Sequence, residues 1–265
     1  MRRIVIIVTL VVLAAIVVGG YLFYRDAADA EAQSTASALE DFRPDAASPG
    51  LERPGVPAQG VYELSVAGDE TIGSGPISFT RDLPDAAPLI VRHLPQGYET
   101  ETRYSDQHTE WVRYEVLEAP GRSAATALVP GAGAYAEWAQ TRISASTISR
   151  TQPRDWRPPP LRLPVEPTVG QTWSGDHRSG DLDVRIESRV EREDVVDVAG
   201  ESVPVVVVRS TQMISGEYDG TRTEHFWYSP ADNLVVRYQI DSSVDGPVDL
   251  DFTADQRLRS LTPQG

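Results

Sequence analysis

The chain has 265 residues, of which 40% are hydrophobic and 24% charged, so it is long enough for one or two globular domains. Its formal net charge of −15 at pH 7 disfavours binding to nucleic acid or to anionic lipid headgroups, because both would repel it. Cysteine is absent, which excludes disulfides, thiolate zinc sites, iron–sulfur clusters and thiol catalysis.

An uncharged apolar run occupies residues 4–24, directly after Arg2 and Arg3. As a helix rising ~1.5 Å per residue, a run of this length spans ~30 Å, the thickness of the hydrocarbon core of a bilayer. Basic residues before the run and acidic residues after it place the amino terminus in the cytoplasm and the rest of the chain outside. We therefore predict a transmembrane signal-anchor over residues 1–25 in the cell membrane. Cleavage at an A-x-A site such as residues 28–30, giving a secreted protein, is the alternative.

Residues 26–59 are rich in Ala, Asp, Glu, Ser and Pro and show little apolar periodicity. Several proline-containing turns in this stretch would end any helix that continues from the membrane span. We predict a disordered tether that holds the following domain away from the membrane.

From Gly60 onward the apolar residues recur with a period of two, which indicates strands. The clearest case is residues 182–191, where apolar residues and Ser188 alternate with charged ones. The same alternation occupies residues 248–255. Further candidate strands are residues 61–66, 76–81, 89–93, 98–104, 110–118, 124–129, 203–208, 211–217 and 221–228. Residues 134–148 fit either a helix or a strand, and their Thr and Ser content favours a strand.

Three turns are indicated between the later strands. Asp219-Gly220 predicts a type I′ hairpin turn, and residues 199–201 and 229–233 predict two more. With about 11–12 strands and no convincing long helix, the sequence predicts an all-β extracytoplasmic domain over residues 60–262. We expect these strands to form an antiparallel sheet.

Residues 152–167 contain six prolines and divide the domain into halves, residues 60–150 and 168–262. We predict extended polyproline-like backbone in this segment, with no strand, and a linker role in preference to a partner-binding motif. One sheet shared by both halves is favoured over two separate domains, because each half alone would barely bury a core.

Few residue patterns in the chain point to chemistry. The four histidines, His93, His108, His177 and His225, are widely spaced and belong to no metal-binding motif. The carboxylate pairs Asp181/Asp183 and Asp249/Asp251 belong to alternating strands, so we expect them on solvated faces. We predict no catalytic residues, no cofactor and no metal site, and the pattern identifies no ligand-binding residues. Tryptophans and tyrosines sharing strands would suit a concave ligand-holding surface, although ordinary core packing explains the same residues and is the favoured interpretation.

Several phrases of the carboxy-terminal half form a recognisable series. They are Val169-Gly170-Gln171-Thr172-Trp173, Val196-Asp197-Val198-Ala199-Gly200, Phe226-Trp227-Tyr228-Ser229-Pro230 and Asn233-Leu234-Val235-Val236-Arg237. In this order they resemble uncharacterised membrane-anchored or secreted envelope proteins of actinobacteria. In a looser way the chain is similar to LolA-type lipoprotein carriers. The second resemblance implies a curved antiparallel sheet, in the form of an open half-barrel or a barrel-like fold. It also implies a lipid or acyl-chain ligand.

These observations leave three functional hypotheses. The first is a non-enzymatic module, anchored through residues 4–24, that binds or assembles another envelope protein. The second is a domain of LolA-like type that binds or carries a lipid or another hydrophobic ligand. The third is an enzyme whose His, Asp and Glu residues converge from distant parts of the sequence. An exposed apolar patch without a cavity would favour the first hypothesis, and an internal cavity would favour the second.

Overall fold

The computed structural model describes residues 30–43, 56–74, 77–95, 97–117, 133–145, 148–164 and 166–265, without the side chains of residues 74, 77, 116–117 and 133–154. The predicted membrane span at residues 4–24 and the candidate strand at 124–129 lie outside this description. Within the described ranges, no helix is both long enough and apolar enough to cross a bilayer.

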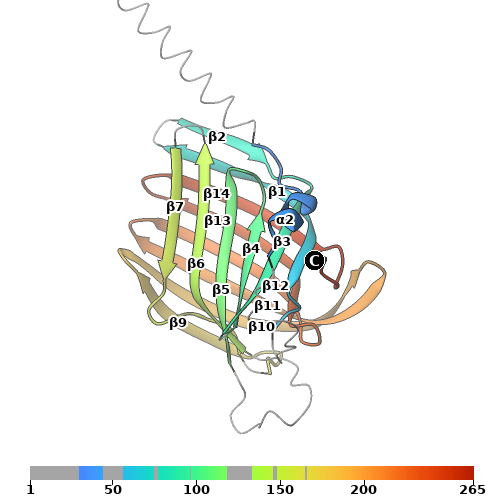
Figure 1. Ribbon diagram of the computed structural model, residues 1–265. Coiled ribbons are helices and arrows are strands. Elements are labelled where there is room, and N and C mark those ends of the chain that lie inside the picture. Colours follow the sequence, from blue (N-terminus) through green and yellow to red (C-terminus); the bar gives the residue numbers. More distant parts are fainter. Residues whose placement is uncertain are drawn as a thin grey trace, which may run out of the picture.

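One helix and fourteen strands make up the described part of the chain (Figure 1). They are α2 (Thr35–Asp41), β1 (Gly60–Ser74), β2 (Ile77–Asp82), β3 (Ala86–Leu94), β4 (Gly97–Arg103), β5 (His108–Leu117), β6 (Gly133–Ala145), β7 (Ile148–Asp155), β8 (Leu161–Leu163), β9 (Thr172–Ser179), β10 (Leu182–Val198), β11 (Glu201–Gly216), β12 (Asp219–Ser229), β13 (Leu234–Asp245) and β14 (Asp249–Leu258).

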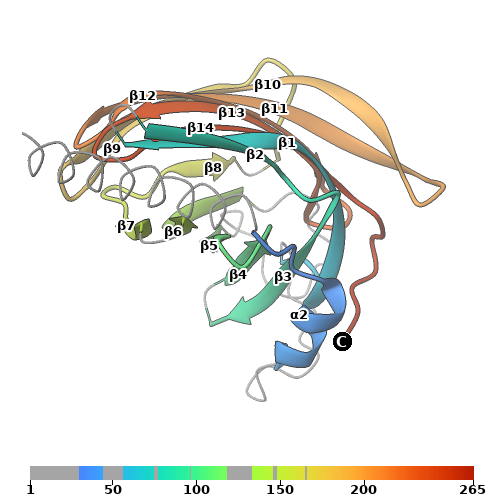
Figure 2. The same ribbon diagram turned by 90° about the horizontal axis from the view of Figure 1, so that it is seen from above.

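All fourteen strands belong to one antiparallel sheet, in the order β7-β6-β5-β4-β3-β1-β14-β13-β12-β11-β10-β9. In addition, β2 pairs with β1 and β8 pairs with β6. The sheet curls over itself, so that β3–β7 face β9–β14 across the interior and β8 lies between them (Figure 2). The predicted all-β curved half-barrel is confirmed, with fourteen strands in place of 11–12, and both halves of the sequence contribute to the one sheet.

Strand β1 forms the corner where the sheet passes from one layer to the other. Its residues 60–65 pair with β3, whereas residues 64–73 pair with β14. Gly68 lies within the β14-paired part and has φ +140°, a conformation that L side chains rarely adopt. A Cβ atom at Gly68 would lie 2.1 Å from the carbonyl oxygen of Thr253. The close approach of β1 and β14 at this corner therefore requires glycine.

The two edges of the sheet approach each other at β7 and β9. One antiparallel bridge joins Arg157, just after β7, to Arg178 of β9, with N–H···O distances of 2.9 and 3.1 Å. The prediction that residues 152–167 contain no strand is wrong, because β7 runs to Asp155 and β8 occupies residues 161–163. A proline is tolerated at position 153 because β7 is an edge strand, where the missing N–H interrupts no ladder on the outer side.

The predicted disordered tether is wrong at residues 35–41, which form α2. Its N-cap is Ser34, whose hydroxyl accepts a hydrogen bond from the backbone N–H of Ser37 at 3.1 Å. Ala38 and Phe42 are buried against Val61 and Ile90. An apolar face of so few residues is too small to appear as periodicity in the sequence.

Two of the three predicted turns lie where the sequence predicts them, and the third lies elsewhere. The predicted turn at residues 199–201 is confirmed, with φ of +53° at Ala199 and +86° at Gly200. Asn233 has φ +55° at the end of the turn that precedes β13. Asp219-Gly220, however, lies inside β12, and the turn is at residues 217–218. Tyr218 is buried beside β10, and this packing together with the pairing to β13 draws Asp219-Gly220 into the strand.

Candidate functional site

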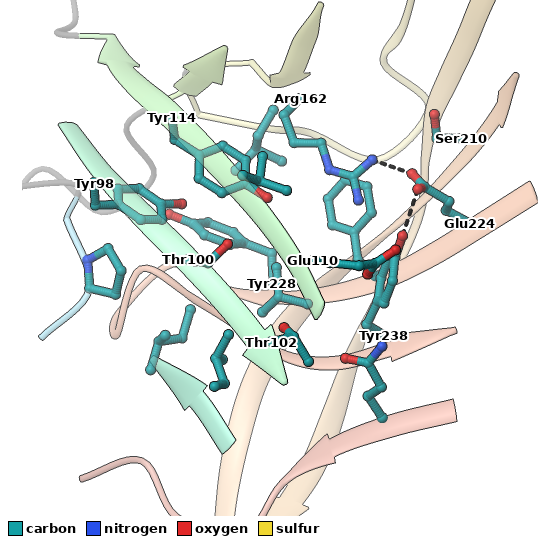
Figure 3. Close-up of a pocket in the computed structure, with 18 of the residues that line it drawn as sticks. Tyr98, Thr100, Thr102, Glu110, Tyr114, Arg162, Ser210, Glu224, Tyr228 and Tyr238 are labelled. Atoms are coloured by element: carbon teal, nitrogen blue, oxygen red, sulfur yellow. Dashed lines mark hydrogen bonds and ion pairs between the residues drawn. The ribbon is translucent and has the colours of Figure 1, made fainter. Parts of the chain in front are cut away.

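A cavity of about 270 Å³ lies between the two layers of the half-barrel (Figure 3). Its lining comes mainly from β3–β5 on one side, from β10–β13 on the other, and from the segment that contains β8, while β1 and β14 contribute Leu64 and Gln256. The apolar and aromatic members are Leu64, Leu89, Val91, Tyr98, Trp111, Val112, Tyr114, Trp156, Leu161, Leu163, Ile186, Phe226, Tyr228, Leu234, Val235, Val236 and Tyr238. Most ligand pockets have roughly 300–1,000 Å³ and mainly apolar walls, so this cavity is close to the lower limit of that range.

Strand alternation decides which side chains of β12 enter the cavity. Successive side chains point to opposite faces of a strand, so the even-numbered residues of β12 share one face. Arg222, Glu224, Phe226 and Tyr228 all line the cavity. Trp227 points the other way, where the guanidinium of Arg237 lies 4.5 Å from its ring centroid.

One end of the cavity is aromatic. Tyr98 of β4 and Tyr114 of β5 are cross-strand partners, and their rings stack with centroids 4.8 Å apart. Tyr228 lies beside them in Figure 3, and its hydroxyl bonds to Oδ1 of Asn233 at 3.1 Å. These rings provide an apolar wall suited to an alkyl chain or a ring.

The other end is charged and centres on the carboxylate of Glu224. This carboxylate accepts hydrogen bonds from Nη1 of Arg162, from Nε of Arg222 at 2.7 Å and from the hydroxyl of Tyr238 at 2.5 Å. Nη2 of Arg222 also donates to the Tyr238 hydroxyl at 3.0 Å. The guanidinium of Arg162 stacks 4.5 Å from the ring centroid of Phe226. Four side chains from β8, β12 and β13 thus form one buried ionic network.

The network changes the proton affinity of its members. Burial alone would raise the pKa of Glu224, but the charges of Arg162 and Arg222 and the donated hydrogen bonds lower it from 4.5 to about 2. Burial raises the pKa of Tyr238 well above its usual range. At neutral pH, Glu224 is therefore an anion and Tyr238 a neutral phenol.

The lowered pKa of Glu224 predicts a loss of stability in acid. In the unfolded chain this carboxyl has its ordinary pKa, so the stabilisation is complete above pH 4.5 and disappears as the pH falls toward 2. The shift corresponds to about 3 kcal/mol of unfolding free energy. Denaturant unfolding of the wild type and of Glu224→Gln between pH 6 and 2.5 measures this, and the variant should show a shallower slope with pH. Equal slopes would contradict the assignment.

A second buried cluster lies beyond Glu110, which lines the cavity. Glu110 accepts a hydrogen bond from the hydroxyl of Tyr104 at 3.2 Å, and Gln256 donates to the same hydroxyl at 2.6 Å. The ring of Tyr104 lies against His108, with centroids 4.7 Å apart. Nδ1 of His108 is 2.7 Å from the carboxylate of Glu70, and both side chains are buried.

Arginine also neutralises Glu70. Nε of Arg81 lies 2.5 Å from its carboxylate. Burial would raise the pKa of Glu70, but His108 and Arg81 together lower it below its ordinary value. Glu70 is thus a buried anion that is paired within this second cluster, and it lies on β1, the strand that forms the corner.

The structure keeps the four histidines apart. His93 and His177 bond to the carbonyl oxygens of Pro57 and Pro158 at 2.9 and 2.7 Å. His225 is partly exposed, 3.9 Å from Glu191. Within the described ranges, no group of three or more His, Asp or Glu residues is placed to hold a metal ion.

The two carboxylate pairs lie away from the cavity, as the sequence predicts. Asp183 is half-exposed and forms a bidentate pair with Arg178 at 2.6 and 3.0 Å. Asp181 and Asp251 are exposed, and Asp249 is intermediate.

Sequence reasoning missed the charged residues that line the cavity. Arg222 and Glu224 share the strand face of Phe226 and Tyr228, so two charges on an aromatic face were a usable signal. Arg162 gave no such signal, because it lies in the proline-rich segment that was interpreted as a linker. Of the tryptophans, Trp111 and Trp156 line the cavity, while the side chain of Trp138 lies outside the described residues.

Comparison with known proteins identifies no family. The chain matches no family model and no curated protein. Among solved structures it is similar to the crystal structure of the hypothetical lipoprotein YmcC from Escherichia coli, with 10% sequence identity and a TM-score of 0.35. The match covers 84% of this chain and 96% of that chain. A likeness at this level carries no argument about function, and the resemblance to actinobacterial envelope proteins stays a prediction.

Proposed function

We propose that the half-barrel binds an apolar or amphipathic small molecule between its two layers. The observation that carries this proposal is the cavity of about 270 Å³, with its largely apolar and aromatic lining. It favours the second hypothesis from the sequence, a hydrophobic-ligand carrier or binding domain. Arg162, Arg222 and Glu224 are paired with one another inside the cavity, and Glu110 accepts a hydrogen bond from Tyr104. These pairings support binding in preference to catalysis.

The protein-binding hypothesis has less support in the described part of the chain. The exposed large hydrophobic residues there are Val169, Val195 and Met213. They belong to the turn before β9, to β10 and to β11, and their strand partners place them at separate positions of the sheet. Single exposed apolar residues are ordinary on protein surfaces and do not indicate a partner interface.

The setting of this function is proposed from the sequence. The uncharged run at residues 4–24 and its flanking charges support export and anchoring in the cell membrane. A tethered half-barrel would then hold its ligand on the extracytoplasmic side, near the lipid from which a hydrophobic molecule could come.

Native mass spectrometry of the full chain, expressed with its own amino-terminal segment and purified in lipid nanodiscs, tests the proposal. We expect a reproducible added mass that organic extraction releases as an amphiphile enriched over the nanodisc lipids. A bare protein mass, with no enrichment, would contradict the proposal and turn attention to crosslinking of a protein partner.

A cavity-filling variant gives an independent prediction. Gln212 of β11 lines the cavity, whereas its neighbour Met213 points outward and is 48% exposed. Gln212→Trp should reduce ligand occupancy about tenfold or more, because the indole takes up space that the ligand needs. Met213→Trp is the matched control and should leave occupancy unchanged. Ligand recovery per mole of protein measures both, and equal recovery from the two variants would place the ligand elsewhere.

A further inference from the structure

The charged end of the cavity presents its cations to the interior and keeps its central carboxylate covered. The side chains of Arg162 and Arg222 are 23% and 28% accessible, whereas that of Glu224 is 3% accessible. Both arginines line the cavity, and β8 carries Arg162 into the space between the layers (Figure 2). A molecule in the cavity would therefore meet guanidinium groups before it met the carboxylate of Glu224.

Hydrogen-bond donors exceed acceptors at this end. Each guanidinium has five N–H groups. Among the described side chains, Arg162 donates to Glu224, and Arg222 donates to Glu224 and to Tyr238. The hydroxyl of Tyr238 is already used, because it accepts from Arg222 and donates to Glu224. Within the described part of the chain, several N–H groups thus remain for an additional acceptor, whereas both oxygens of Glu224 are occupied.

Glu110 is the other carboxylate of the cavity lining and would oppose an anionic ligand. It already accepts a hydrogen bond from Tyr104, and Figure 3 shows it close to Tyr238. With Glu110 included, the two arginines and two glutamates have no net charge. The arrangement of donors, more than the net charge, therefore favours an acceptor-rich group.

The aromatic end sets the other requirement on the ligand. Tyr98, Tyr114 and Tyr228 lie on the side of the cavity opposite Glu224 and Tyr238 (Figure 3). A volume of about 270 Å³ holds about nine groups of the size of a water molecule or a methylene, at about 30 Å³ each. One short apolar chain fits this space, and a two-chain lipid does not.

We propose that the ligand is a single-chain amphiphile with an acidic head, a carboxylate or a phosphate, which contacts Arg162 and Arg222. Its apolar tail lies between Tyr98, Tyr114 and Tyr228. This inference rests on the proposed function, since it assigns a chemical class and an orientation to the ligand of the same cavity. Charge-assisted hydrogen bonds from guanidinium to carboxylate or phosphate are the strong ones in proteins, and inside a cavity they are little screened.

The test uses four probes with the same six-carbon chain and a diazirine at its end: hexanoate, hexyl phosphate, hexanol and hexylammonium. Each is photo-crosslinked to the full chain in nanodiscs, and labelled peptides are quantified against probe concentration. We expect at least one acidic probe to bind about tenfold or more tightly than hexanol, and hexylammonium to bind most weakly. Labels should fall on the peptides that contain Tyr98 and Tyr114. The two acidic probes distinguish a fatty-acid-like ligand from a phosphate-headed one.

A variant pair tests the role of the guanidinium. Arg162→Gln removes one cation and leaves Glu224 paired with Arg222, so the preference for the acidic probe over hexanol should largely disappear. Arg185→Gln is the matched control, because Arg185 is on β10 with an exposed side chain paired to Glu187 and Asp176. If Arg162→Gln does not fold, the ranking of the four probes on the wild type still tests whether the ligand has an acidic head.

The possible results distinguish a failure of the acidic head group from a failure of the proposed function. Equal binding of hexanoate, hexyl phosphate and hexanol inside the cavity would overturn the acidic head and leave the proposed function intact. Preference for hexylammonium would overturn the acidic head too, and would assign the dominant charge to Glu110. No labelling of cavity peptides by any probe would overturn both the proposed function and this inference.

Discussion

Replacing Glu224 by glutamine should lower the free energy of unfolding by about 3–5 kcal/mol. The substitution keeps the shape of the side chain but removes the charge that neutralises Arg162 and Arg222 inside the half-barrel. Two guanidinium groups would then share the cavity with Glu110 as their only nearby carboxylate among the described residues that line it. Thermal unfolding of the full chain, followed by circular dichroism, should show a melting temperature lower by roughly 6–20 °C.

Asp183→Asn is the matched control for this effect. Asp183 also forms a close carboxylate–arginine pair, but on the exposed face of β10, where the side chains of Arg178 and Asp183 are 68% and 49% accessible. Exposed pairs of this kind contribute little to stability, because water and salt screen them. If the two substitutions proved equally costly, the Glu224 network would not be the buried ionic centre that the geometry shows.

Gly68→Ala should be the second strongly destabilising change, by about 2–6 kcal/mol. Two effects combine at this position of β1. The positive φ strains any residue with a Cβ, and the added atom would lie 2.1 Å from the carbonyl oxygen of Thr253. To relieve that contact, β1 would have to move away from β14 at the corner that joins the two layers.

Gly73→Ala, on the same strand, separates these effects from a general intolerance of β1 to alanine. A Cβ atom at Gly73 would lie 3.4 Å from Cβ of Ser78 and 3.5 Å from Cβ of Asp249, which are ordinary contacts. We expect this variant to change the free energy of unfolding by about 1 kcal/mol or less. Equilibrium denaturation of the two variants gives the comparison, and a similar loss in both would show that the corner tolerates a Cβ at Gly68.

The two predictions bear on the same cavity by different routes. Gly68 shapes the corner that brings β3–β5 opposite β10–β13, whereas the Glu224 network holds the polar end of the space between them. Loss of the corner should therefore abolish ligand binding together with folding. Loss of one network arginine should change ligand preference while the half-barrel persists.

The alternation of apolar and polar residues along the sequence was sufficient to predict the strands. In β10 the buried positions Leu182, Val184, Ser188 and Val190 follow the alternation of the sequence, and Ile186 on the same face is partly buried. Alternation is a local property, since neighbouring side chains of a strand point to opposite faces whatever the strand pairs with. The all-β class followed from such segments, whereas the curved half-barrel was expected from the resemblance to LolA-type carriers.

Local pattern failed where long-range contacts decided the conformation. Pro153 is in a strand because β7 is an edge strand of the described sheet. Helix α2 forms because Ala38 and Phe42 pack against Val61 and Ile90. Asp219-Gly220 is in β12 because β13 extends to pair with it. In each case the conformation depends on contacts with residues distant in the sequence, or on the position of a strand at the edge of the sheet. A short stretch of sequence shows neither.

The sequence by itself therefore determined the fold class, most strand positions and several turns, because these depend on neighbouring residues. It also provides the whole case for a membrane span at residues 4–24. The tertiary structure alone decided the cavity and its charged end, since Arg162 and Glu224 meet only after the sheet has curled. Leu64 of β1 pairs with Leu258 of β14 to join the two ends of the domain. Such pairing depends on the global arrangement of strands, which a pattern of alternating residues does not encode.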